Sequence, residues 1–152
     1  MGTVTFALIG LLIATPAVAQ QRPMAEVFSE RDIEIHRQCG VGHSGLNAAV
    51  ESALRRNGYR IAPREHREAM LVYVNLNPVA IQGGCAISFK VEFSFIDSAR
   101  APWGQRYVLK HVICSQGVIL TGPIIDLQAR LRTHAAELTE ICISEEERYR
   151  DR

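Results

Sequence analysis

Residues 87–95 (ISFKVEFSF) decide the fold, because apolar and polar residues alternate strictly along this stretch. Successive side chains of a β-strand point to opposite faces of a sheet, so strict alternation predicts one buried face and one polar face. The apolar positions carry three phenylalanines. We therefore expect Phe89 and Phe93 to lie buried under helices.

Further strands are predicted on both sides of this stretch. Residues 69–76 (AMLVYVNL) are apolar enough for a central strand, which Asn77-Pro78 should end. Residues 106–113 resume the alternation, and Gly117 is expected to interrupt it. Residues 31–36 also alternate, which predicts an earlier, half-buried strand.

Two amphipathic helices are predicted, one before and one after these strands. Ser44 is suited to cap the first helix, and Gly58 is suited to the left-handed position that ends it. Pro123 is suited to the first turn of the second helix. Both segments carry apolar residues at helical spacings of three and four: Leu46, Ala49, Val50, Ala53 and Leu54, then Ile124, Leu127, Leu131, Ala135, Leu138 and Cys142.

The order strand, helix, several strands, helix predicts an α+β fold. One mainly antiparallel or mixed sheet of about four strands, with two helices packed on one face, would bury both apolar stripes. Residues 31–144 are expected to form this single domain, and residues 145–152 a charged, solvated tail.

The beginning of the chain is typical of exported proteins. Residues 4–14 (VTFALIGLLIA) are uncharged and apolar, and Ala17-Val18-Ala19 follows as a small-x-small cleavage site. We expect residues 1–19 to be a signal peptide and residues 20–30 a flexible mature N-terminus, which gives a periplasmic or secreted protein. The alternative is an uncleaved anchor, although a membrane span takes about 20 apolar residues.

Four cysteines follow the predicted cleavage site: Cys39, Cys85, Cys114 and Cys142. An even number in an exported chain indicates disulfides, and four cysteines allow three pairings. We favour Cys85–Cys114 with Cys39–Cys142, because Cys85 and Cys114 flank a predicted hairpin at similar distances from its turn. Their positions in the alternation point to opposite faces, so this pairing requires a β-bulge.

Composition and motifs give little support to most other functions. Lys and Arg number 17 against 16 Asp and Glu, with no basic patch interleaved with aromatics, so nucleic-acid binding is not expected. Residues 42–45 (GHSG) resemble a nucleophile elbow, but Leu46 replaces the final glycine. No residues are assigned to catalysis and no cofactor is expected.

A metal site is the main alternative. His36, Cys39 and His43 have a spacing that Cu or Zn could use, since imidazole and thiolate are ligands of both metals. A small metal-binding protein or enzyme centred on the turn from His36 to Ser44 is therefore the rival hypothesis. A disulfide at Cys39 would remove the thiolate.

Two apolar segments are expected to be exposed. Trp103, the only tryptophan, lies in the turn APWG, and Pro78, Val79 and Ile81 lie in the connection between two strands. Tryptophan is a frequent interface anchor, so these residues are the candidates for a partner surface. Trp103 could instead fold back over the end of the sheet.

The pattern of elements resembles a group of small cell-envelope domains. Residues 46–59 (LNAAVESALRRNGY), 70–76 and 86–95 are similar to the N-terminal domain of the TolB translocation protein and to lipopolysaccharide-assembly lipoproteins. The resemblance implies a non-enzymatic domain that binds a protein or another envelope partner. The chain departs from the lipoproteins because no cysteine lies near the cleavage site.

Overall fold

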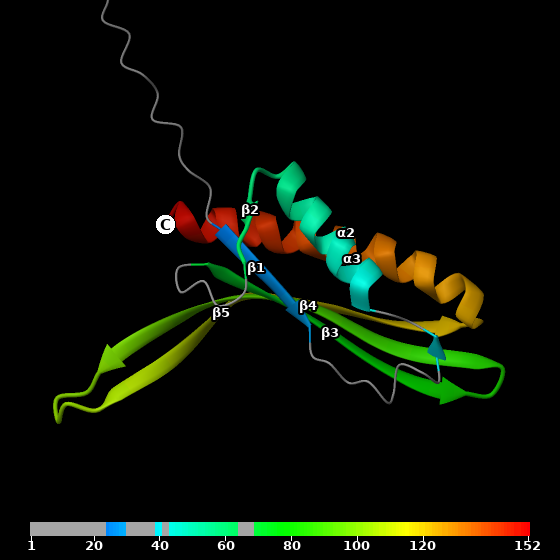
Figure 1. Cartoon of the computed structure of the whole chain (residues 1–152), viewed down its shortest axis with the longest axis horizontal. Helices are drawn as coiled ribbons and strands as arrows, with labels where there is room; N and C mark the ends of the chain where they lie inside the picture. Colours follow the sequence, from blue (N-terminus) through cyan, green and yellow to red (C-terminus); the bar gives the residue numbers. More distant parts are fainter. Residues whose placement is uncertain (1–23, 30–38, 41–42, 64–68) are drawn as a thin grey trace, which may run out of the picture.

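The computed structural model describes residues 24–29, 39–40, 43–63 and 69–152. They form an α+β domain with five strands in one mixed sheet, in the order β2-β1-β3-β4-β5. In chain order the elements are β1 (Met24–Ser29), α2 (His43–Arg56), β2 (Arg60–Ile61), β3 (Met70–Ile81), β4 (Gly84–Arg100), β5 (Arg106–Gly122) and α3 (Ile124–Arg150). Figure 1 shows both helices on the same side of the sheet. The predicted fold class is confirmed, with five strands rather than about four.

The core lies between the helices and one face of the sheet. Phe89 and Phe93 are fully buried, as the alternation of β4 predicts. From α3, Leu127, Leu131 and Ala135 are also fully buried against this face. β3 and β4 pair in antiparallel register, with Val72 opposite Phe93 and Leu76 opposite Phe89, so the apolar rows of the two strands form one surface.

The prediction of a flexible N-terminus over residues 20–30 is wrong for residues 24–29. They form β1, which lies between β2 and β3 and is parallel to both. Ala25 is fully buried there. The backbone partners of β1 come from distant parts of the chain, so nothing in its own six residues indicates the pairing. The predicted signal peptide and the predicted strand at 31–36 lie outside the described residues.

Two predicted strand breaks are also wrong. β3 continues through Asn77-Pro78, because β1 pairs with β3 only as far as Val74 and the rest of β3 is an edge among the described residues. Proline is tolerated on an edge because the missing N–H has no partner to lose. Gly117 lies within a continuous ladder opposite Lys90 and does not interrupt β5.

The predicted charged tail belongs to α3 as far as Arg150, and one of its residues is part of the core. Glu146 is fully buried. The Tyr59 hydroxyl donates to Glu146 Oε2 at 2.6 Å, and Arg150 Nε lies 2.7 Å from Glu146 Oε1. Burial, and then the hydrogen bond to Glu146, raise the pKa of Tyr59 well above its usual value. These contacts hold the end of α3 against the segment that follows α2.

All four cysteines form disulfides, but the favoured pairing is wrong. The bonds are Cys39–Cys85 and Cys114–Cys142. Cys114 lies opposite Phe93 in the β4–β5 ladder, whereas Cys85 lies at the far end of the same ladder, opposite Gly122. Cys85 and Cys114 are therefore too far apart along the hairpin to bond.

Replacing Phe93 by alanine tests the core. We expect Phe93→Ala to lower the free energy of unfolding by about 3–5 kcal/mol, because it leaves a cavity under the helices. Ile96→Ala is the matched control: Ile96 is three positions further along β4 and 53% exposed, so its loss should cost less than about 0.5 kcal/mol. Denaturant unfolding of the oxidised protein measures both, and equal effects would contradict the described core.

Candidate functional site: the projecting arm

The β4–β5 hairpin extends beyond the rest of the sheet. Each strand has 17 residues, but β3 pairs with β4 only as far as Ser94. Beyond that point, among the described residues, β4 and β5 pair only with each other, from Phe95 opposite His111 to Arg100 opposite Arg106. We call residues 95–112 the arm. Six strand residues and a turn give it a reach of about 20 Å, and Figure 1 shows it bending away from the side that carries the helices.

Large apolar side chains are exposed on both faces of the arm. Val108 is 73% exposed, and its neighbour Leu109, which points to the opposite face, is 42% exposed. Ile96, Tyr107 and Val112 are exposed as well. Isolated apolar residues are common on protein surfaces, but a contiguous group indicates an interaction site. The described residues leave this group uncovered.

Trp103 lies at the tip of the arm and is 72% exposed. The tip turn is closed by hydrogen bonds from Ala101 N to Gln105 O and from Gly104 N to Ala101 O, both 2.8 Å. The Trp103 ring meets Tyr107 edge to face, with centroids 6.4 Å apart. Trp103 therefore points outward from the tip and does not cover the end of the sheet.

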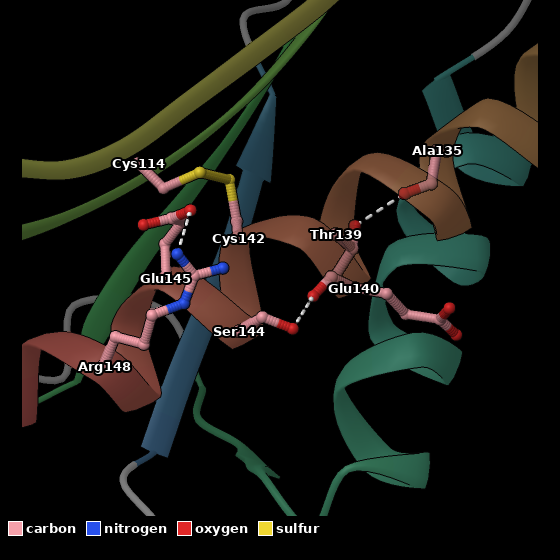
Figure 2. Close-up of a disulfide and its surroundings, with 8 residues drawn as sticks. All are labelled: Cys114, Ala135, Thr139, Glu140, Cys142, Ser144, Glu145 and Arg148. Carbon is pink, nitrogen blue, oxygen red and sulfur yellow. Dashed lines mark hydrogen bonds and ion pairs between the residues drawn. A yellow bond between two sulfur atoms is a disulfide. The ribbon is translucent and has the colours of Figure 1, made fainter. Parts of the chain in front are cut away.

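A β-bulge marks the base of the arm. The register shifts between Phe93 and Ser94, so Ile113 is the extra residue and Cys114 lies opposite Phe93. The shift turns Cys114 to the face that carries the helices, where it bonds to Cys142 of α3. Figure 2 shows this disulfide joining the strand to the helix. The disulfide thus links β5 covalently to α3 at the point where the arm leaves the body of the protein.

A cluster of charges on the opposite face of the sheet also connects the arm to the body. Glu92 is 7% exposed and lies between Lys90, whose Nζ is 2.9 Å from Glu92 Oε2, and Lys110 of the arm, whose Nζ contacts Glu92 Oε1. The same Nζ lies 5.9 Å from the centroid of the Tyr73 ring. Burial alone would raise the pKa of Glu92, but hydrogen bonds from Lys110 and Lys90 and their charges together lower it.

The structure places the other partner-binding candidates at the opposite end of the sheet. Val79 is 61% exposed and Ile81 is 46% exposed, both near the β3–β4 turn. Pro78 was expected to be exposed but is buried, because it continues the helix-facing row of β3 opposite Ile87. Figure 1 shows this turn and the arm at opposite ends of the sheet, so the two candidate segments do not form one surface.

The proposed metal ligands do not form a site in the part of the chain that is described. The Cys39 sulfur is bonded to Cys85, which removes the thiolate. His36 lies outside the described residues, as does the side chain of His43. Within the described ranges no three His, Cys, Asp or Glu side chains are grouped to hold a metal ion.

Neither of the described helices combines the length and the apolar character that crossing a membrane requires.

No protein-family model and no curated protein sequence matches the chain. Among solved structures, a minor lipoprotein from Acinetobacter baumannii is similar over 82% of this chain and 92% of its own, at 10% identity and a TM-score of 0.37. The rare lipoprotein B from Shewanella oneidensis is similar over 85% of this chain and 99% of its own, at 13% identity and a TM-score of 0.35.

The charge cluster at Glu92 should make stability depend on pH. Because the folded-state pKa of Glu92 is lowered, its ionised form stabilises the fold above the unfolded pKa, and this contribution is lost as the pH falls through the folded pKa. We expect Glu92→Gln to reduce the free energy of unfolding at pH 7, and the difference from the natural protein to shrink below about pH 5. Glu51→Gln, in an exposed pair with Arg55, is the control and should change little. A Glu92→Gln difference that stays constant between about pH 7 and pH 3 would contradict the cluster.

Removing the Cys114–Cys142 bond should loosen the base of the arm. Its separation of 28 residues predicts a loss of about 3–4 kcal/mol for Cys114→Ser with Cys142→Ser. Cys39→Ser with Cys85→Ser removes the other bond, of separation 46, and should cost a similar amount. Hydrogen exchange of the amides at 111–115 distinguishes the two variants. We expect faster exchange there only in the first, and equal exchange in both would show that this bond does not hold the arm.

Proposed function

We propose that this chain is an exported, non-enzymatic domain of the cell envelope that binds another envelope component through its arm. The observation that carries the proposal is the exposure of apolar side chains on both faces of a ribbon that projects from the body. Each strand of the arm also has one edge without a partner strand among the described residues. Such edges are sites where partners bind or chains aggregate, so the arm is expected to be covered in the functional state.

Export is supported by the first nineteen residues and by the cysteines. All four are oxidised in disulfides, which persist in the periplasm or outside the cell and are rare in the cytosol. The resemblance of residues 46–59, 70–76 and 86–95 to envelope domains supports the same location. The partner is a protein or another envelope component, without involvement of nucleic acid.

The shape of the arm supports a binding role in a second way. The bulge, the Cys114–Cys142 bond and the contact between Lys110 and Glu92 all lie at its base and fix its direction. An apolar ribbon that is held in place loses less conformational entropy on binding than a flexible loop does.

Site-specific photo-cross-linking tests the proposal with a matched pair of positions. Val108 in the arm and Ile119 in the body are both on β5, and each is 73% exposed. A photoreactive residue is placed at either position in the full chain, which is expressed in intact cells with its own leader. We expect an adduct with a protein or a lipid from Val108 and none from Ile119, and a mature mass that begins at Gln20. Equal adducts, no adducts, or a retained leader would contradict the proposal.

Trp103→Ala distinguishes a role of Trp103 in binding from a role in stability, when association and the free energy of unfolding are both measured. If Trp103 anchors the partner, the change should weaken the association by about 2 kcal/mol or more. The free energy of unfolding should change by less than about 0.5 kcal/mol, because the side chain is exposed. A variant that is destabilised but still forms the adduct would assign Trp103 to the fold instead.

A further inference from the structure

We propose that the tip of the arm binds an anionic membrane surface, with Arg100 and Arg106 paired with lipid phosphates and Trp103 and Tyr107 at the level of the headgroups. This inference rests on the proposed function, because it names the envelope component that the arm contacts. It is carried by the charges and the aromatic side chains at the tip.

Two arginines lie directly opposite each other at the neck of the tip. Arg100 is the register partner of Arg106 across the β4–β5 ladder, and both are exposed. Like charges directly opposite each other across two strands destabilise the pairing. Within the described part of the chain neither guanidinium has an ion pair. An anion bound between them would convert this repulsion into an attraction, since guanidinium and phosphate form charge-assisted hydrogen bonds.

Arg100 and Arg106 are the cations of the arm that have no ion pair among the described residues. The third cation, Lys110, is held by Glu92. The single acidic residue, Asp97, accepts a hydrogen bond from the backbone N of Ser98 at 2.7 Å and lies nearer the base. With three cations and one anion the arm carries a charge of +2, while the whole chain carries only +1. Positive charge is therefore concentrated on the projecting element.

The aromatic side chains indicate a lipid surface as the source of the anions. Trp103 and Tyr107 are 72% and 42% exposed, and their rings meet edge to face at the tip. Tyr107 follows Arg106 in β5, so the aromatic rings and the arginines lie on opposite faces of the same tip. Tryptophan and tyrosine concentrate at the boundary between lipid and water, because each combines an apolar ring with a polar group. Exposed Val108 lies on the arginine face, two positions from Arg106, and can enter the same boundary region.

The backbone of the arm limits how deeply it can enter. From Phe95 to Arg100, the edge of β4 that faces away from β5 has no partner strand among the described residues. Unpaired N–H and C=O groups are not tolerated in the hydrocarbon core, so the tip can lie in the headgroup layer but cannot cross the bilayer. A second copy of this chain is a poor occupant, because it would bring another pair of uncompensated arginines to the same place.

Vesicle binding of the full mature chain, residues 20–152, tests the inference. Trp103 is the only tryptophan, so its fluorescence reports on the tip alone. We expect a blue shift and co-sedimentation with vesicles of phosphatidylglycerol and phosphatidylcholine, weaker binding as salt is added, and little binding to phosphatidylcholine alone. Equal binding to both kinds of vesicle, or to neither, would overturn the proposal.

A charge-matched pair of variants assigns the binding to the tip. Arg100→Gln with Arg106→Gln should weaken binding to the anionic vesicles about thirty-fold. Arg55→Gln with Arg56→Gln removes the same charge from α2, where the two arginines pair with Glu51 and Glu140, and should leave binding unchanged. Equal effects of the two double variants would overturn the proposal, because binding would then follow net charge.

The cross-linking experiment separates failure of this inference from failure of the proposed function. A protein adduct from Val108, together with no vesicle binding, would overturn the lipid surface and retain the arm as the binding element. An acidic protein is the partner expected in that case. The absence of both an adduct and vesicle binding would overturn both proposals.

Discussion

The ladder between β4 and β5 is the interaction on which the rest of the structure depends. It is continuous from Cys85 to Arg100 apart from one bulge, but its two halves have different surroundings. Between Cys85 and Phe93 the ladder is covered by α3 and extended by β3, so its apolar row becomes the core. Beyond Ser94 the part of the chain that the structure describes gives these two strands neither a covering helix nor a third strand. The body and the arm are thus two parts of one hairpin, and the bulge is the boundary between them.

The sequence predicted the parts of the fold that depend on local pattern. Alternation in residues 87–95 indicated the buried row of β4, and Gly58, with a φ of 81°, ends α2 as expected. β1 could not be predicted, because its place depends on parallel partners far along the chain. The sequence pattern also did not predict how far the arm extends beyond the sheet. Tyr107 and Leu109 alternate like buried residues, and only the extent of the helices decides that they are exposed.

The candidate site was predicted in part, for similar reasons. A Pro-Trp-Gly turn between two strands indicated an exposed Trp103, and the structure has it exposed. The cluster at Glu92 was missed, because Lys110 reaches it only across the bulge, and alternation gives no sign of where a register shifts. The disulfide assignment failed for a different reason. The bulge that it required is present and turns Cys114 to the face that also carries Cys85, but Cys85 lies opposite Gly122 and Cys114 opposite Phe93, too far apart along the hairpin to bond. Pro78 was misjudged because proline can lie within an edge strand as well as end a strand.

The connectivity of the disulfides has a consequence for how the chain matures. Each disulfide joins two consecutive cysteines of the sequence, Cys39 with Cys85 and Cys114 with Cys142, so the two covalent loops neither overlap nor enclose each other. In a chain that is oxidised as it emerges with its N-terminus first, the first two thiols to meet the oxidant are already native partners, and so are the last two. The native bonds then form in order of appearance. Maturation needs an oxidant but no thiol–disulfide exchange to rearrange wrong pairs.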